Sequence, residues 1–198
     1  MKISEILWNL LAPLYDLLRR NPISGHFLKM ENQAIKKLFE NIPIHNLKTT
    51  CDLGVGRGHS LHLIPETIPL RIAIDRSLPM MHFTRKHSPE TYFINANVLN
   101  IPIKEASVDL ILCIGLIEYI QNLESLLSQI DAILKNGGYL LLSYSPKNIF
   151  TFLRSLRGHR LYPRNWEKIE TSVSKYDYEL TESKSTPLQQ QCLFIKKN

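Results

Sequence analysis

The sequence has little of what a disulfide framework, a zinc centre or a membrane span requires. Its three cysteines, Cys51, Cys113 and Cys192, lie far apart within apolar runs, so we expect buried thiols in a reducing cytoplasm. Seven histidines show neither an H-x-x-x-H pair nor cysteine-paired spacing, so we expect no metal site. No uninterrupted run of 18 apolar residues occurs, and the apolar amino-terminal stretch lacks a small-residue cleavage site. The sequence predicts neither a membrane span nor a signal peptide.

Acidic residues are missing from one long segment of a chain whose net charge is +6. No Asp or Glu occurs between Asp131 and Glu167, and aromatic and aliphatic residues alternate there with cations. The basic residues of this segment are Lys135, Lys147, Arg154, Arg157, Arg160 and Arg164. The pattern suits an anionic membrane surface, an anionic substrate or RNA, and a solvated helix over the active site is the alternative. We take Arg154, Arg157 and Arg160 as candidate contacts to a substrate or to a membrane on which the protein is peripheral.

Strand and helix patterns alternate along most of the chain. Strands are predicted at 49–53, 70–75, 92–95, 108–114 and 139–144, with a closing antiparallel pair at 176–182 and 191–196, and the runs at 108–114 and 139–144 have the apolar character of central strands. Three-and-four spacing predicts helices at 3–20, 25–40, 58–64, 77–87 and 165–174. A further helix is expected between the cap Asn122 and the stop Asn136-Gly137-Gly138.

This alternation predicts an α/β fold with a doubly wound, mostly parallel seven-stranded sheet, an antiparallel last strand and helices on both faces. A length of 198 residues suits one domain. We divide it into lid helices (1–45), a core (49–145), a basic amphipathic insert (146–164) and a carboxyl-terminal helix with a strand pair (165–198).

A glycine-rich loop follows the first predicted strand of the core. The run Cys51-Asp52-Leu53-Gly54-Val55-Gly56-Arg57-Gly58 lets the backbone turn sharply and approach a ligand closely. Asp75 ends the next strand, 21 residues after Gly54, where a carboxylate can accept hydrogen bonds from both ribose hydroxyls. Loop and acid together predict a bound nucleoside.

The spacing of the glycines separates two classes of nucleoside-binding protein. Dinucleotide-binding loops read G-x-G-x-x-G, but position 59 is His59 and the glycines here read G-x-G-x-G behind an acid. The chain resembles the class I S-adenosylmethionine-dependent methyltransferases over roughly residues 49–145. Further similarities are Ala96-Asn97-Val98-Leu99-Asn100-Ile101-Pro102 after the third strand and Ser107–Cys113 with Glu118-Tyr119-Ile120 around the fourth. The segment Ala12-Pro13-Leu14-Tyr15-Asp16 is similar to the one that begins quinone-pathway and phospholipid methyltransferases, and the chain most resembles the methyltransferase-11, quinone-biosynthesis-like subgroup.

The resemblance implies S-adenosylmethionine as cofactor and assigns its contacts. The methionine part would lie beside the loop, the ribose at Asp75 and the adenine near Arg76 and Asn97, where the family usually has Asp. The full set of expected cofactor residues is Asp52, Leu53, Gly54, Gly56, Gly58, Asp75, Arg76, Asn97, Val98 and Ile114.

Methyl transfer from a sulfonium requires alignment and exclusion of water more than a catalytic acid or base. For a phenol or an acidic carbon a base would help, and the candidates are Tyr15, His59, Glu118, Tyr119 and His159. We expect O-, C- or N-methylation of a small-molecule or lipid-like acceptor. The alternatives are an RNA methyltransferase, a non-catalytic cofactor-binding interaction protein and, against the glycine spacing, an NAD-linked oxidoreductase.

Overall fold

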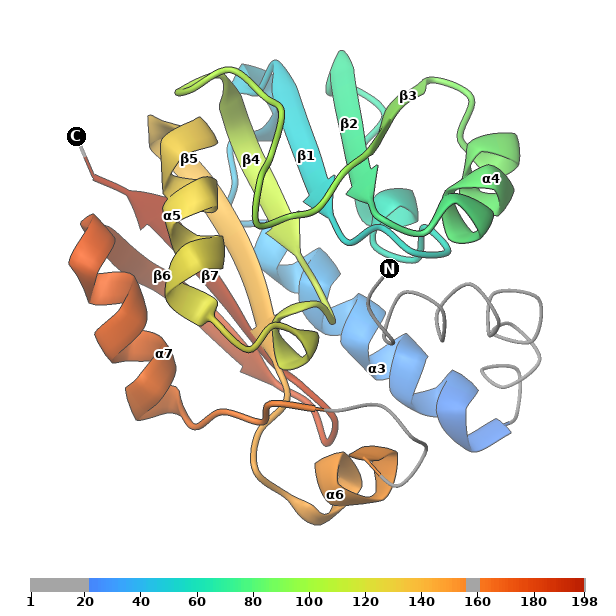
Figure 1. The fold of residues 1–198 in the computed structure, drawn as a ribbon, viewed down its shortest axis with the longest axis vertical. Coiled ribbons are helices and arrows are strands. Elements are labelled where there is room, and N and C mark those ends of the chain that lie inside the picture. Colours follow the sequence, from blue (N-terminus) through green and yellow to red (C-terminus); the bar gives the residue numbers. More distant parts are fainter. Residues whose placement is uncertain (1–21, 156–160, 198) are drawn as a thin grey trace.

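A computed structural model describes residues 22–155 and 161–197. Its centre is a seven-stranded sheet with the order β3-β2-β1-β4-β5-β7-β6, in which β7 runs antiparallel to both of its neighbours (Figure 1). The remaining neighbours pair in parallel. The predicted doubly wound α/β fold with an antiparallel last strand is therefore confirmed.

The strands agree closely with the apolar runs of the sequence. They are β1 Thr49–Leu53, β2 Leu70–Asp75, β3 Thr91–Asn95, β4 Val108–Cys113, β5 Leu134–Tyr144, β6 Tyr178–Ser185 and β7 Gln190–Lys196. The α-helices are α3 Pro22–Phe39, α4 Leu78–His87, α5 Leu123–Ile133, α6 Ile149–Ser155 and α7 Trp166–Val173. Short 3-10 turns are η1 Ile44–Asn46, η2 Leu61–Leu63, η3 Ile117–Tyr119 and η4 Ser174–Tyr176.

Alternate residues of the central strands supply two separate cores. On β4, Ile111 and Cys113 pack with α5 and α7, whereas Leu110 and Leu112 pack with α3 and α4. Successive side chains of a strand point to opposite faces, so a strand covered on both sides must be apolar throughout. The apolar runs at 110–113 of β4 and 140–142 of β5 reflect this double burial, and all three cysteines are buried thiols as expected.

Two local predictions need correction. Asn122 caps α5 as predicted, through a 3.2 Å bond from the Ser125 N–H, but the helix ends at Ile133. Asn136-Gly137-Gly138 therefore lies inside β5, where the pairing of β4 with β5 shifts register and Gly137 has φ +72°. The expected helix at 58–64 is only the turn η2, and the expected helix at 3–20 lies outside the described residues.

The parallel strands end at one edge of the sheet, and the loops that follow them meet there. In Figure 1, α3 runs past this edge below β1 and β2. Ligands of such sheets bind at the carboxyl ends of the strands. Within the described part of the chain, no helix is long and apolar enough to cross a bilayer.

Candidate active site

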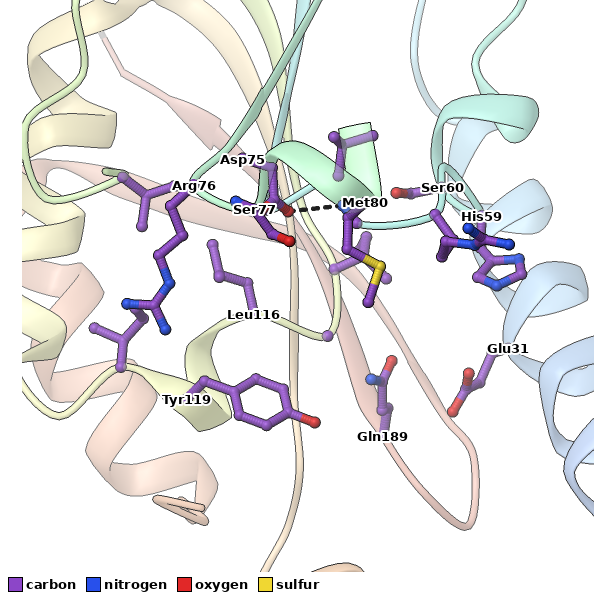
Figure 2. Close-up of a pocket in the computed structure, with 18 of the residues that line it drawn as sticks. Glu31, His59, Ser60, Asp75, Arg76, Ser77, Met80, Leu116, Tyr119 and Gln189 are labelled. Atoms are coloured by element: carbon purple, nitrogen blue, oxygen red, sulfur yellow. Dashed lines mark hydrogen bonds between the residues drawn. The ribbon is translucent and has the colours of Figure 1, made fainter. Parts of the chain in front are cut away.

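A cavity lies at the carboxyl ends of β1, β2, β3 and β4, and α3 closes one side of it (Figure 2). Seven of the ten residues expected to contact a cofactor line this cavity: Gly54, Gly56, Asp75, Arg76, Asn97, Val98 and Ile114. They come from four separate loops of the sequence. Asp52, Leu53 and Gly58 lie outside the lining, so their expected direct contact is not supported by the geometry.

Asp75 joins the end of β2 to the glycine loop. One carboxylate oxygen accepts a 2.8 Å hydrogen bond from the Gly56 N–H, and the other accepts one of 2.8 Å from the Ser77 N–H. Burial raises the pKa of Asp75, although these backbone donors act in the opposite direction. Each carboxylate oxygen has a further lone pair, so Asp75 can still accept bonds from a ligand.

Gly56 and Gly58 of the loop have different roles, although both, like Gly54, have a positive φ, which favours glycine. A Cβ on Gly58 would lie 2.5 Å from Thr84 Cγ2 of α4, so Gly58 allows the loop to pack against that helix. A Cβ on Gly56 would meet nothing nearer than the Gly54 carbonyl oxygen at 3.9 Å. Gly56 thus leaves its space open on the cavity side, as close approach of a ligand to the backbone requires.

Asp52 stands behind the loop rather than in the cavity. Its side chain is buried on β1 and accepts a 2.6 Å hydrogen bond from the Ser60 hydroxyl. Burial raises the pKa of Asp52 to about 7, the bond from Ser60 opposes this rise, and the charge of Asp75 adds to it. Asp52 therefore fixes the loop through Ser60, which does line the cavity.

Asn97 already uses the oxygen that was expected to meet the adenine. Its Oδ1 accepts a 3.1 Å hydrogen bond from the Leu99 N–H, which closes a local turn. Val98 beside it is buried and lines the cavity. The side-chain oxygen has one remaining lone pair for a ligand.

Several lining residues were not predicted from the sequence. α3 contributes Leu28, Glu31, Asn32 and Ile35, which share one helical face. The remainder are Val55, Arg57, Ser60, Ser77, Met80, Ala96, Gly115, Leu116, Ile120 and Gln189. The spacing of 28, 31, 32 and 35 was a usable signal for α3, but Gln189 had none, because a hairpin far along the chain brings it to the site.

The base candidates separate into three groups. His59 and Tyr119 line the cavity, and Figure 2 shows the Tyr119 ring extending into it from below Leu116. Glu118 is buried away from the lining, where its Oε1 accepts a 3.1 Å bond from the Ser145 hydroxyl. Tyr15 and His159 lie outside the described residues.

Two of the cations between Asp131 and Glu167 are not free surface charges, although the sequence suggested a uniformly cationic segment. Lys135 pairs with Asp109 at 2.6 Å, and Arg164 is 7% exposed. The Arg164 guanidinium donates to the carbonyl oxygens of Ile117, Ile120 and Tyr162, and so supports the turn η3. Arg154 belongs to α6, whereas Arg157 and Arg160 lie outside the described residues.

Residues 51–142 match a protein-family model described as a methyltransferase domain. This segment is therefore a methyltransferase domain, as the resemblance of residues 49–145 predicted. The methyltransferase domain covers β1 through most of β5, and it therefore includes the glycine loop, Asp75 and the residues after β3 and β4.

Two relatives in sequence extend the comparison. Trans-aconitate 2-methyltransferase of Escherichia coli O139:H28 is 28% identical over 117 residues, which are 58% of this chain and 46% of that protein. An uncharacterized protein of Methanocaldococcus jannaschii, MJ0638, is 33% identical over 135 residues, 65% of this chain and 57% of that protein. The chain thus spans about half the length of the curated relatives it matches.

A solved structure extends the likeness of fold beyond the methyltransferase domain. Magnesium protoporphyrin IX methyltransferase from Synechocystis PCC 6803, crystallised with bound SAH, superposes with a TM-score of 0.78 at 15% identity. The match covers 98% of this chain and all of that one. The flanking elements, α3 and the β6–β7 hairpin, therefore belong to the same fold as the methyltransferase domain.

Proposed function

We propose that this protein transfers a methyl group from S-adenosylmethionine to a small or amphipathic acceptor by in-line displacement. The observation that carries the proposal is the meeting of the Asp75 carboxylate, the open Gly56 backbone and the residues after β3 and β4 in one cavity. A carboxylate matches ribose hydroxyls, and a loop without side chains matches a ligand that lies against the backbone.

The chemistry of the lining suits an aligned displacement. Alignment and exclusion of water supply the acceleration that such a transfer needs, because the sulfonium already activates the methyl group. α3 covers the cavity from one side, and Leu116, Tyr119 and Ile120 line it near η3. His59 and Tyr119 are the described side chains placed to take a proton from an acidic acceptor.

An apolar surface next to α3 supports an amphipathic acceptor. Phe27 of α3 contacts Phe150 of α6 edge to face, with ring centroids 5.6 Å apart. Ile149 and Phe152 of α6 are about 60% exposed, at 62% and 59%. Leu28, the residue after Phe27, lines the cavity, so an acceptor with an apolar part would meet this surface on its way in.

The proposal is tested in two steps. Calorimetry should first show binding of S-adenosylmethionine and its demethylated product, and no binding of NADH. Purified protein with labelled cofactor is then added to separate metabolite, lipid and RNA fractions from cells lacking the gene, and small-molecule and lipid products are scored for a gain of one methylene in mass. A Gly56→Val variant serves as the control, since its side chain occupies the open space at the loop. Label in a small molecule or lipid supports the proposal. Label in RNA would show that the acceptor is RNA instead. Cofactor binding without any transfer would favour a non-catalytic protein.

A further inference from the structure

Two buried polar side chains line the cavity at the end that is remote from β3, one from α3 and one from the β6–β7 hairpin. Glu31 of α3 is 8% exposed, and Gln189 of the β6–β7 hairpin is 4% exposed. Figure 2 shows both side chains pointing into the same space below Met80. Neither belongs to the methyltransferase domain at 51–142, and neither was expected from the sequence.

Gln189 has a fixed backbone and an unsatisfied side chain. The Thr186 N–H donates to its carbonyl oxygen at 2.8 Å, and its own N–H donates to Thr186 Oγ1 at 3.1 Å. Its Oε1 is buried without a hydrogen-bond partner among the described residues. A buried acceptor of this kind loses free energy unless a donor reaches it, so the geometry anticipates a donor from a ligand.

A chain of contacts holds Glu31 at the carboxyl end of β4. The Gly115 N–H donates to Ser143 Oγ at 2.8 Å, Ser143 pairs with Gln191 across β5 and β7, and Gln191 Nε2 donates to the Glu31 carbonyl oxygen at 3.3 Å. Gln189 reaches the same point, since a Cβ added to Gly115 would lie 3.3 Å from its Nε2. Glu31 and Gln189 therefore both line the cavity near the end of β4.

The strand order places this point relative to a bound nucleoside. Along β3-β2-β1-β4, the cavity presents Asn97 and Val98, then Asp75, then the glycine loop, and finally Gly115 with Glu31 and Gln189. If adenine lies at the first and ribose at the second, the amino-acid end of the cofactor lies at the last. That end carries an ammonium group, which a carboxylate and an amide oxygen complement.

We infer that Glu31 and Gln189 form the subsite for the ammonium group of the cofactor's amino-acid end. This inference rests on the proposed cofactor. Buried carboxylates favour a cationic, hydrogen-bond-donating ligand, and Gln189 adds a neutral acceptor beside Glu31.

Two ligands test the subsite without any acceptor. S-adenosylhomocysteine carries the amino-acid end, and 5′-methylthioadenosine lacks it but keeps adenosine and sulfur. In calorimetry, Glu31→Gln should raise the Kd of S-adenosylhomocysteine about tenfold or more, because it removes a charged acceptor. Gln189→Leu should raise it by roughly two- to tenfold, as expected for one neutral hydrogen bond. The Kd of 5′-methylthioadenosine should change less than about twofold in both variants.

The controls separate failure of the subsite from failure of the proposed function. Glu40→Gln removes the same charge from an exposed residue just after α3 and should leave both affinities unaltered. Equal weakening of the two ligands in Glu31→Gln, or an unchanged affinity for S-adenosylhomocysteine, overturns the subsite while cofactor binding stands. Wild-type protein that binds neither ligand overturns both proposals, and melting temperatures identify any variant that fails to fold.

Discussion

The Asp75 carboxylate accepts a 2.8 Å hydrogen bond from the Gly56 backbone N–H, across the gap between β2 and the glycine loop. The same side chain accepts the Ser77 N–H at the start of α4. One acidic residue thus sets the positions of the loop and of α4, and also lines the cavity. Its replacement should therefore affect both ligand affinity and the order of the loop.

Asp75→Asn should raise the Kd of S-adenosylhomocysteine by roughly ten- to a hundredfold. The amide keeps the shape of the side chain but turns one acceptor into a donor, and hydrogen bonds to charged groups contribute about 1.5–3 kcal/mol each. Calorimetry measures the change, with Glu90→Gln as an exposed control of equal charge outside the cavity. NADH binding that depends on Asp75, without a response to S-adenosylmethionine, would return the protein to the oxidoreductase class.

Gly58→Ala should lower the free energy of unfolding by about 2–4 kcal/mol. The new Cβ would be held at φ +78° and would lie 2.5 Å from Thr84 Cγ2. Thr84→Ser removes that methyl group and keeps the Oγ1 bond to the Gly56 carbonyl oxygen, so the double variant should recover part of the loss. Gly56→Ala, with no close neighbour, should cost only about 1–2 kcal/mol. Urea denaturation that shows equal losses at the two glycines would contradict this division of tasks.

Arg164→Met should destabilise the protein by about 3–5 kcal/mol, because it removes the partner of buried groups. The Arg164 guanidinium bonds to the carbonyl oxygens of η3, and the charge of Glu118 counteracts the lowering of its pKa by burial. Adding Glu118→Gln should restore part of the stability, since no uncompensated carboxylate then remains. Lys168→Met on the exposed side of α7 is the control, and a similar loss there would argue against a specific role.

Asp52 predicts a distinctive dependence of stability on pH. Burial raises the pKa of Asp52 in the folded protein from 3.8 to about 7. The contribution of the protonated side chain to the free energy of unfolding is therefore complete below about pH 4 and is lost as the pH rises through 7. This difference in pKa corresponds to up to about 4 kcal/mol. Asp52→Asn, neutral at every pH, should gain stability relative to the wild type between pH 4 and 8. If the free energies of unfolding of the two proteins change in parallel with pH over this range, the pKa of Asp52 is not raised as predicted.

The basic insert predicts binding to anionic vesicles. Arg154, Arg157 and Arg160 would each contribute about 1 kcal/mol near such a surface, so changing all three to Gln should reduce sedimentation with vesicles about a hundredfold at low salt. The matched control changes the exposed Lys36, Lys37 and Lys104 to Gln. Equal losses in both triple variants indicate a non-specific charge effect. If the wild-type protein does not sediment with the vesicles, the insert is better interpreted as a solvated segment over the active site.

Local sequence determined most of the fold and half of the site. The segments 49–53 and 70–75 predicted two strands at their observed bounds, because β-branched residues favour strands and turn residues follow each segment. The loop after β1 and Asp75 after β2 could be paired from sequence, since parallel strands end at the same edge of the sheet. Asn122 likewise predicted its cap, because the bond to Ser125 spans only one helical turn.

Only tertiary structure decided which side chains complete the cavity and which cations stay at the surface. Gln189 reaches the site because β7 pairs antiparallel with β5, and no local pattern encodes that approach. Arg164 reads as a surface cation in sequence, but the carbonyl oxygens of η3, more than 40 residues earlier, draw it inside. Asn136-Gly137-Gly138 looked like a helix stop, yet pairing with β4 starts the strand at Leu134. In each case the decisive partner is distant in sequence, so the choice depends on contacts that exist only once the sheet has formed.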